Sequence, residues 1–207
     1  MVDRAGKPAT VSARVATETD LDAVAETFGL AFEDDPVWNW AFRVSEHGPE
    51  PLRRAWRFVV SSTLDYGWVW LTDGCASASL WIPPGKPELK QEDEEPFGAL
   101  LEEQLGADAA RVLDTFERFD RAHPHDRGHH YYLSLLATHP DQAGRGIGIG
   151  LLADNLARID AEGAAAFLES SNPANDHRYE RLGFSRCGEF ELGEDGPVVT
   201  QMWRDPR

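Results

Sequence analysis

The residues best suited to chemistry follow an apolar run at 131–138. A glycine-rich turn comes next, with Gly144, Gly146 and Gly148, and a helical pattern begins directly after it. Glycine has no Cβ, so the backbone of such a turn can approach a ligand closely. The N–H groups at the start of the helix point at one spot, and the helix dipole favours an anion there. This arrangement predicts a binding site for a phosphate-bearing ligand.

Two common nucleotide motifs do not fit this turn. The Walker A motif requires Gly-Lys-Ser or Gly-Lys-Thr after its second glycine, and no such triplet follows here. The dinucleotide motif G-x-G-x-x-G also fails, because Gly148 comes one residue too early after Gly146.

The turn and a later stretch together resemble the acetyl-CoA site of the GNAT acetyltransferases. His139-Pro140-Asp141 followed by Gly144-Arg145-Gly146-Ile147-Gly148 is similar to that family's signature, Q/R-x-x-G-x-G/A. FLESSNPANDHRYERLGF is similar to its second cofactor strand and to the helix bearing its tyrosine acid. The resemblance extends over most of the chain and looks closest to puromycin N-acetyltransferase. One departure is Ala143, which stands where the family usually has Gln or Arg.

The resemblance implies a single α/β domain with a mixed, mostly antiparallel sheet. The sheet is expected to splay between strands at 131–138 and 164–170, with helices on both faces. We expect a flexible tail at 1–10, an N-acetyltransferase domain at 11–207, and a helical acidic insert at 86–128 on the acceptor side.

The resemblance also assigns site residues. The pantetheine arm of acetyl-CoA is expected to pair like an extra strand with the first central strand, and the pyrophosphate to lie on the glycine turn. The predicted cofactor-binding residues are Leu136, Ala137, Thr138, Ala143, Gly144, Arg145, Gly146, Ile147, Gly148, Asn172 and Asn175. Asn175 has an alternative interpretation as an ordinary helix N-cap.

Tyr179 is the predicted general acid, because a phenol with a pKa of ~10 is protonated at neutral pH. The alternative is a half-buried core tyrosine. Glu169 is the predicted general base, and a surface carboxylate at a strand end is the alternative. Asp34, Asp35 and His139 are weaker candidates for the base. No Ser-His-Asp or Cys-His arrangement stands out, which favours direct attack of an amine on the thioester.

The predicted function is transfer of an acetyl group from acetyl-CoA to a primary amine of a small, antibiotic-like molecule or metabolite. One alternative is acetylation of a peptide or protein. Another is a CoA-binding module without catalysis, which would not need Tyr179.

The charge of the chain limits its partners. The 207 residues carry a formal charge of -16, which argues against nucleic acid and anionic membrane surfaces as partners. The same charge favours a cationic amine. Two cysteines without metal-ligand spacing and a polar start without a signal core favour the cytoplasm and no metal. A homodimer is compatible with the family.

The other elements are expected around these two stretches. A strand at 11–17 precedes a helix that ends near Pro36, and a second helix covers 51–66. A hairpin joins 68–72 to 76–82, and strands at 185–192 and 198–203 close the sheet.

Three segments carry alternatives. The aromatic run at 37–42 is either core or a substrate wall, and the insert is either a packed cap or a lid of one or two helices. Four histidines cluster at the end of the insert, His123, His125, His129 and His130. They could form a metal site, but solvated loop histidines are the favoured interpretation.

Overall fold

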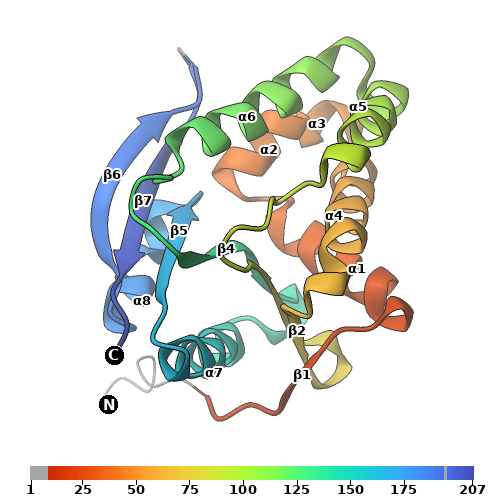
Figure 1. The fold of residues 1–207 in the computed structure, drawn as a ribbon. Helices are drawn as coiled ribbons and strands as arrows, with labels where there is room; N and C mark the ends of the chain where they lie inside the picture. Colours follow the sequence, from red (N-terminus) through yellow and green to blue (C-terminus); the bar gives the residue numbers. More distant parts are fainter. Residues whose placement is uncertain (1–8, 194) are drawn as a thin grey trace, which may run out of the picture.

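One open sheet of seven strands runs through the structure in the order β1-β2-β3-β4-β5-β7-β6 (Figure 1). A computed structural model describes residues 9–193 and 195–207, so most of the predicted tail at 1–10 lies outside the described residues. The strands are β1 (Ala13–Val15), β2 (Val69–Thr72), β3 (Ser77–Ile82), β4 (His130–Thr138), β5 (Ala165–Ser170), β6 (Ser185–Glu191) and β7 (Val198–Arg204). All neighbours are antiparallel except β4 and β5, which are parallel. The predicted mixed, mostly antiparallel sheet is confirmed.

Eight α-helices connect the strands within the described residues. They are α1 (Leu21–Phe32), α2 (Pro36–Phe42), α3 (Val44–His47), α4 (Glu50–Thr63), α5 (Gln91–Leu105), α6 (Ala109–Ala122), α7 (Ile147–Ala161) and α8 (Asp176–Arg181). No helix in 9–193 or 195–207 has the length and apolar character needed to cross a bilayer.

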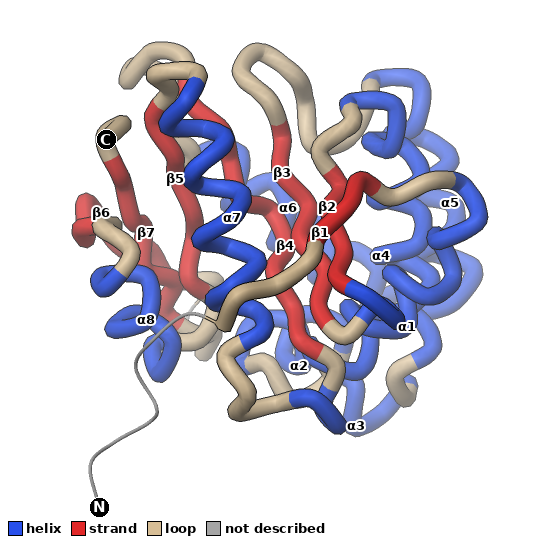
Figure 2. Tube along the Cα trace, turned by 90° about the horizontal axis from the view of Figure 1, so that it is seen from below, coloured by secondary structure: helices blue, strands red, loops and turns tan. Residues whose placement is uncertain are grey.

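The helices lie on both faces of the sheet, as predicted. Figure 2 shows α7 lying across one face, with α8 beside it near β6 and β7. Leu152, Leu156 and Ile159 of α7 are buried there against Leu133 and Leu168 of the two central strands. The remaining helices cover the opposite face, where α1 packs on β3 and β4 and α4 packs on α1.

The start of α2 follows from two consecutive residues, Asp35 and Pro36. Asp35 is extended and caps the helix, because its Oδ1 accepts hydrogen bonds from the N–H groups of Val37 at 3.0 Å and Trp38 at 3.2 Å. Pro36 occupies the first helical position, where its missing N–H leaves nothing unpaired. The predicted end of the preceding helix near Pro36 is thereby explained.

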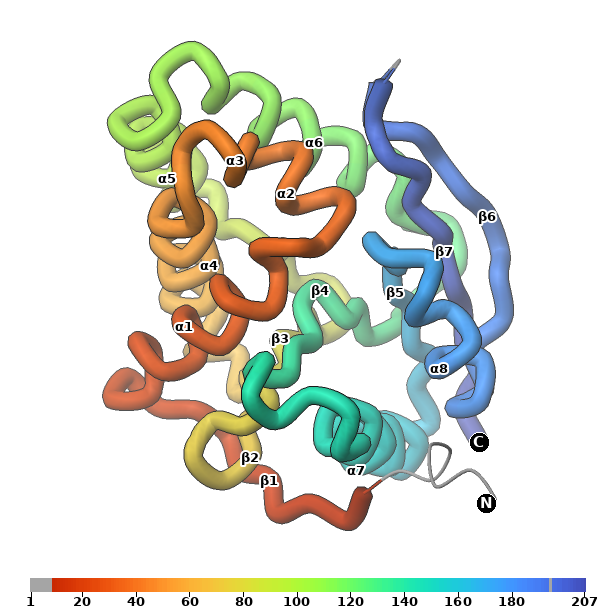
Figure 3. The backbone as a smooth tube through the Cα atoms, turned by 180° about the vertical axis from the view of Figure 1, so that it is seen from behind, coloured from red at the N-terminus to blue at the C-terminus, as the bar shows by residue number. Residues whose placement is uncertain are grey.

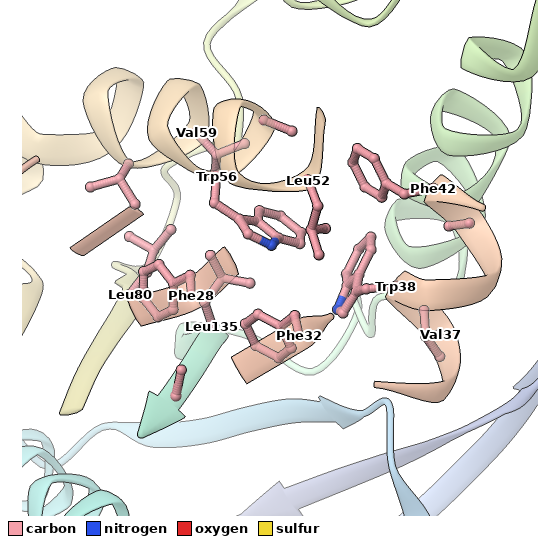
Figure 4. Close-up of a cluster of buried hydrophobic side chains, with 14 of the residues drawn as sticks. Phe28, Phe32, Val37, Trp38, Phe42, Leu52, Trp56, Val59, Leu80 and Leu135 are labelled. Carbon is pink, nitrogen blue, oxygen red and sulfur yellow. The ribbon is translucent and has the colours of Figure 1, made fainter. Parts of the chain in front are cut away.

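The aromatic run at 37–42 contributes to a buried cluster (Figure 4). Trp38 packs edge-on against Trp56 of α4, with ring centroids 4.6 Å apart, and it stacks on Phe119 of α6 at 5.6 Å. Val37 and Phe42 are fully buried. The core interpretation of this run is therefore confirmed for these side chains.

The insert forms two helices, α5 and α6, and packs as a cap. The ring of Phe97 in α5 packs on Phe58 of α4, with ring centroids 5.3 Å apart, and on Phe116 of α6, with ring centroids 5.5 Å apart. Leu101 and Val112 are fully buried. The apolar faces of these helices therefore pack on the aromatic cluster.

Candidate active site

The two central strands pair only where they begin. His130–Leu133 of β4 lies in register with Ala165–Leu168 of β5, and from Ser134 onward β4 has no strand on that side. Figure 3 shows β4 continuing into the loop that leads to the N-terminal end of α7. The unpaired backbone edge of β4 is a position where an extended ligand arm can add like a strand. The predicted splay is confirmed.

A β-bulge lies at the point where the strands part. Leu80 of β3 is opposite Leu135, whereas Trp81 is opposite Leu133, so Ser134 is an extra residue in β4. A bulge bends the strand and increases its local twist. The bulge therefore accompanies the divergence of β4 from β5.

The glycine turn has the geometry that was predicted from the residue types. Gly144 and Gly146 have φ of +76° and +73°, in the left-handed region that favours glycine. Gly146 is the N-cap of α7 and offers no side chain to the helix. The N–H groups of Ile147 and Gly148 lie in the first turn, so they have no intrahelical acceptor. These amides remain for a ligand anion.

Gly148 is required by the close approach of α7 to β4. A Cβ at this position would lie 2.4 Å from Thr138 Oγ1, closer than real side chains come. Thr138 in turn lies 3.4 Å from Ser77 Oγ of β3. The end of β4 and the first turn of α7 are therefore held together by a contact that only glycine permits.

The remaining loop residues are open to solvent. Ala143 is exposed, and its N–H donates to the Pro140 carbonyl at 3.0 Å, so this amide is already engaged. Arg145 is exposed beside the free amides and supplies positive charge in a strongly acidic chain. His139 accepts a hydrogen bond from the Asp141 N–H at 3.3 Å, which gives it a local structural role.

Tyr179 lies on α8, half-buried against Phe184 with ring centroids 6.2 Å apart. Its hydroxyl makes no hydrogen bond within 9–193 and 195–207. Burial, followed by the nearby Asp35 carboxylate, raises the pKa of Tyr179 to about 12. The phenol is therefore fully protonated at neutral pH and has a donor that no described residue uses.

Asp35 links the two sides of the site. Ser171, in the loop after β5, donates a hydrogen bond of 2.7 Å to Asp35 Oδ2. Asp35 is buried, and this burial raises the pKa of its carboxyl group. The α1–α2 loop is thus fastened to the loop that leads into the helix of Tyr179. Asp34, by contrast, is exposed.

Replacing Asp35 with alanine is expected to lower the free energy of unfolding by about 1–2 kcal/mol, because α2 loses its N-cap. The change also removes the acceptor of the Ser171 hydroxyl. Urea denaturation measures the effect, and Asp34→Ala is the matched control at an exposed neighbour. Equal stability of the two variants would contradict this role of Asp35.

Glu169 faces Tyr132 across the two central strands. The Tyr132 hydroxyl donates to Glu169 Oε2 at 2.9 Å, while Glu169 Oε1 is shielded from solvent and has no partner among the described residues. Burial is the main cause that raises the pKa of Glu169 well above its ordinary value. The strand-end surface interpretation of Glu169 is wrong, because its carboxyl group is enclosed.

The two asparagines have different local roles. Asn172 caps the short turn after β5, since its Oδ1 accepts from the Ala174 N–H at 3.1 Å. Asn175 precedes α8 but makes no side-chain cap, and its Oδ1 accepts from Arg178 at 3.0 Å. Asn175 is thus the N-cap residue of α8 by position, as the alternative interpretation has it, although its side chain does not bond the first turn.

The four histidines at the end of the insert divide into two groups. His125 and His129 are exposed, as expected of loop histidines. His130 is buried and His123 is half-buried, which corrects the expectation, because their rings pack on each other at 4.9 Å and on Phe167. His130 Nδ1 lies 2.8 Å from the Gly128 carbonyl and therefore donates to it.

This arrangement fixes the proton positions of the buried pair. Since His130 Nδ1 carries the proton, its Nε2 accepts from His123 Nε2 at 2.9 Å. Burial lowers the pKa of His123 to about 4 and also lowers that of His130. Both rings are therefore neutral at pH 7. Within 9–193 and 195–207, no group of three or more His, Cys, Asp or Glu residues could hold a metal ion.

Comparison with known proteins agrees with this geometry. Residues 122–205 match the family model for the acetyltransferase (GNAT) domain. A Corynebacterium glutamicum structure described as histone acetyltransferase HPA2 and related acetyltransferase is similar over 96% of this chain and 98% of that chain, with a TM-score of 0.64 and 21% identity. The chain has the GNAT fold. The general expectation of an acyltransferase is confirmed by the family match together with this fold.

Two further structures share the GNAT fold. An agmatine N-acetyltransferase matches with a TM-score of 0.66 and 14% identity, over 95% of this chain and 100% of that chain. A Drosophila melanogaster polyamine N-acetyltransferase, which forms N-acetylagmatine, matches with a TM-score of 0.65 and 15% identity, over 94% and 99% of the two chains.

Three residues of this site were not predicted from the sequence as site residues. Tyr132 and Ser134 lie within an apolar run that indicates only a buried strand, and Ser171 is one of two adjacent serines. The tyrosine pair at 131–132 was a usable signal for Tyr132, because alternate residues of a strand face opposite sides of a sheet.

Proposed function

We propose that the protein transfers an acetyl group from acetyl-CoA to a primary amine of a small molecule. The observation that supports this most is the gap between β4 and β5. The glycine turn with its free amides lies at the end of β4, and the carboxyl group of Glu169 lies at the end of β5. Tyr179 follows on α8. In this proposal a phosphate anchor, a proton acceptor and a hydrogen-bond donor would serve one reaction at the gap between β4 and β5.

The residues present fit acetyl-CoA. The N–H groups of Ile147 and Gly148 would hold the pyrophosphate, and the free edge of β4 from Leu136 to Thr138 would pair with the pantetheine arm. Asn172 and Asn175 would add polar contacts to that arm. Acetyl-CoA supplies an activated acyl group as a thioester.

Different residues of the chain are proposed to assist different steps of acyl transfer. A neutral amine attacks the carbonyl carbon, a C–N bond forms, and the C–S bond breaks. Glu169 takes the proton of the attacking amine, and its raised pKa makes it a better proton acceptor than an ordinary carboxylate. Tyr179 donates a hydrogen bond from its free hydroxyl to the sulfur, which departs as a thiolate. No covalent link to the protein is required.

The acceptor is proposed to be a cationic amine in solution. The chain carries a formal charge of -16, which raises the local concentration of cations. Two proteins of the same fold act on agmatine or polyamines by their names. Antibiotic-like amines such as puromycin remain in the proposed range, because the acceptor side is where function diverges on a shared fold.

A panel of amines tests the proposal through the release of free thiol from acetyl-CoA. The panel contains agmatine, putrescine, puromycin, an aminoglycoside and short peptides. Saturable release with a small amine supports the proposal. Thiol release with peptides alone would favour peptide acetylation. Tight binding of acetyl-CoA without thiol release for any acceptor of the panel would favour a binding module.

Replacing Glu169 with glutamine is expected to lower kcat/KM about 100-fold, since general base catalysis contributes roughly 10²–10⁴-fold. Because the pKa of Glu169 is raised, the wild-type carboxyl group loses its proton only as pH rises through that higher pKa. Protonation of the amine substrate alone lowers kcat/KM toward acid pH. The wild-type kcat/KM should fall more steeply than this, because Glu169 is protonated as well.

The pH profile separates this role from a structural one. The kcat/KM of Glu169→Gln should depend on pH only through protonation of the amine substrate. Glu102→Gln removes one negative charge at an exposed position of α5, and its pH profile should match the wild type. Identical pH profiles for Glu169→Gln and the wild type would show that Glu169 is not the base.

A further inference from the structure

A second carboxylate lies beside the reaction centre without a role in the chemistry described above. Glu88 belongs to the loop between β3 and α5, and it is half-buried. The hydroxyl of Ser134 donates a short hydrogen bond to Glu88 Oε1. Ser134 is the bulge residue of β4, so Glu88 is attached at the point where the two central strands part.

Glu88 and Glu169 are neighbours around Tyr132. Burial is the main cause that raises the pKa of the Tyr132 hydroxyl, and the charges of Glu169 and Glu88 raise it further. Burial is also the main cause of the raised pKa of Glu169, and the charge of Glu88 adds to it. Tyr132 is bonded to Glu169 and Ser134 is bonded to Glu88, and these two residues of β4 are only two positions apart. The two acidic groups therefore lie together at the point where β4 and β5 part.

No cation of the described residues neutralises this site. Neither Glu88 nor Glu169 forms an ion pair with a lysine or arginine in 9–193 or 195–207. The two lysines that flank Glu88 lie over the Tyr66 ring instead, with Lys86 Nζ at 5.5 Å and Lys90 Nζ at 5.3 Å from its centroid. The negative charge of Glu88 and Glu169 is thus available to pair with a cationic ligand.

The unpaired oxygen of Glu169 supports this conclusion independently. Glu169 Oε1 is shielded from solvent and has no hydrogen-bond partner among the described residues. A buried carboxylate oxygen without a hydrogen-bond partner is costly, and proteins normally pair it. Burial accordingly raises the pKa of Glu88 to about 7, so the site is easily ionised once a cation enters.

We infer that Glu88, held by Ser134, binds a second positive charge of the acceptor, and that the preferred substrates are amines with a second cationic group, such as short diamines or guanidino-amines. This inference depends on the proposed acetyl transfer. Tyr132 and Ser134 are two residues apart, which is roughly 7 Å along a strand, and this spacing suits a short aliphatic chain. The reacting amine then faces Glu169, and the distal cation faces Glu88.

The test compares putrescine with n-butylamine, which has the same four-carbon chain but no second amino group. The measured quantity is the ratio of kcat/KM for the two acceptors, obtained from thiol release with acetyl-CoA. The wild type should favour putrescine. Glu88→Gln should lower this ratio about tenfold or more, mainly through the KM for putrescine, since a hydrogen bond to a charged group is worth about that factor.

Two further variants make the outcome specific. Ser134→Ala leaves the charge in place but removes its anchor, so the ratio should fall in the same direction by a smaller factor. Glu102→Gln removes an exposed charge of the same insert and should keep the wild-type ratio. Thermal unfolding and calorimetric binding of acetyl-CoA confirm that each variant is folded.

The possible failures are distinguishable. A putrescine preference that Glu88→Gln leaves unchanged, or a wild type that does not prefer putrescine, would overturn the role of Glu88 while acetyl transfer to amines stands. Absence of thiol release with every amine would remove the proposed acetyl transfer, and the inference with it.

Discussion

Tyr179→Phe is expected to lower kcat about 100-fold while leaving the affinity for acetyl-CoA nearly unchanged, since removal of one donor to a developing charge costs roughly 10²–10³-fold. The hydroxyl has no partner among the described residues, so its removal leaves no protein group unsatisfied. The phenyl ring retains the packing on Phe184.

The raised pKa of Tyr179 refines its proposed role. At about 12, it lies far above the pKa of ~8.5 of an ordinary thiol. Complete proton transfer to the leaving thiolate would therefore be unfavourable, and stabilisation by a hydrogen bond is the main contribution. The rate should consequently stay independent of a tyrosine ionisation up to about pH 10.

Single-turnover kinetics and calorimetry measure the two quantities separately. Tyr66→Phe is the matched control, because the Tyr66 hydroxyl only donates to the Pro87 carbonyl at 3.3 Å. An unchanged kcat for Tyr179→Phe would show that another group assists the departing sulfur, or that the site does not catalyse this reaction.

Gly148→Val is expected to weaken acetyl-CoA binding about 100-fold. The new Cβ would lie 2.4 Å from Thr138 Oγ1, so we expect the valine to push the first turn of α7 away from β4. Two amide hydrogen bonds to a charged phosphate are then lost, each worth about 1.5–3 kcal/mol. Their sum corresponds to a factor of 100 or more in the dissociation constant.

Gly98→Val provides the control for this change. Gly98 lies in α5, and a Cβ there would have nothing within 4 Å. Both variants place valine in a helix, so the difference between them isolates the contact of α7 with β4. Equal affinity of both variants for acetyl-CoA, measured by calorimetry, would exclude the glycine turn as the phosphate site.

The order of elements could be predicted because local signals agree with the fold. The apolar run, the glycines and the helical pattern at 131–161 specify β4, the turn and α7 without information from elsewhere in the chain. The second strand and the helix with Tyr179 follow from the same kind of signal. The positive φ of Gly144 and Gly146 shows why glycine is needed there.

The contacts across the site could not be predicted from local patterns. Asp35 and Ser171 are 136 residues apart and meet only because α2 packs toward the end of β5. The burial of His123 and His130 depends on Phe167 and on the register of β4 with β5. Side-chain pairing of this kind is decided by tertiary packing.

The acidic acceptor site shows the same limit. Glu88 lies in a segment rich in charged residues, where solvent exposure is the ordinary expectation. It is instead half-buried, and the hydroxyl of Ser134, the bulge residue of β4, donates a hydrogen bond to it. The bulge has no signal in the sequence near Glu88.

The most direct test of acetyl transfer is the stoichiometry of its products. Wild-type protein is incubated with acetyl-CoA and the best amine of the panel, and free CoA and N-acetylated amine are quantified in the same sample by mass spectrometry. Equal amounts of both, with formation slowed about 100-fold in Tyr179→Phe, are the predicted result. Free CoA without acetylated amine, or equal rates in both proteins, would contradict the account.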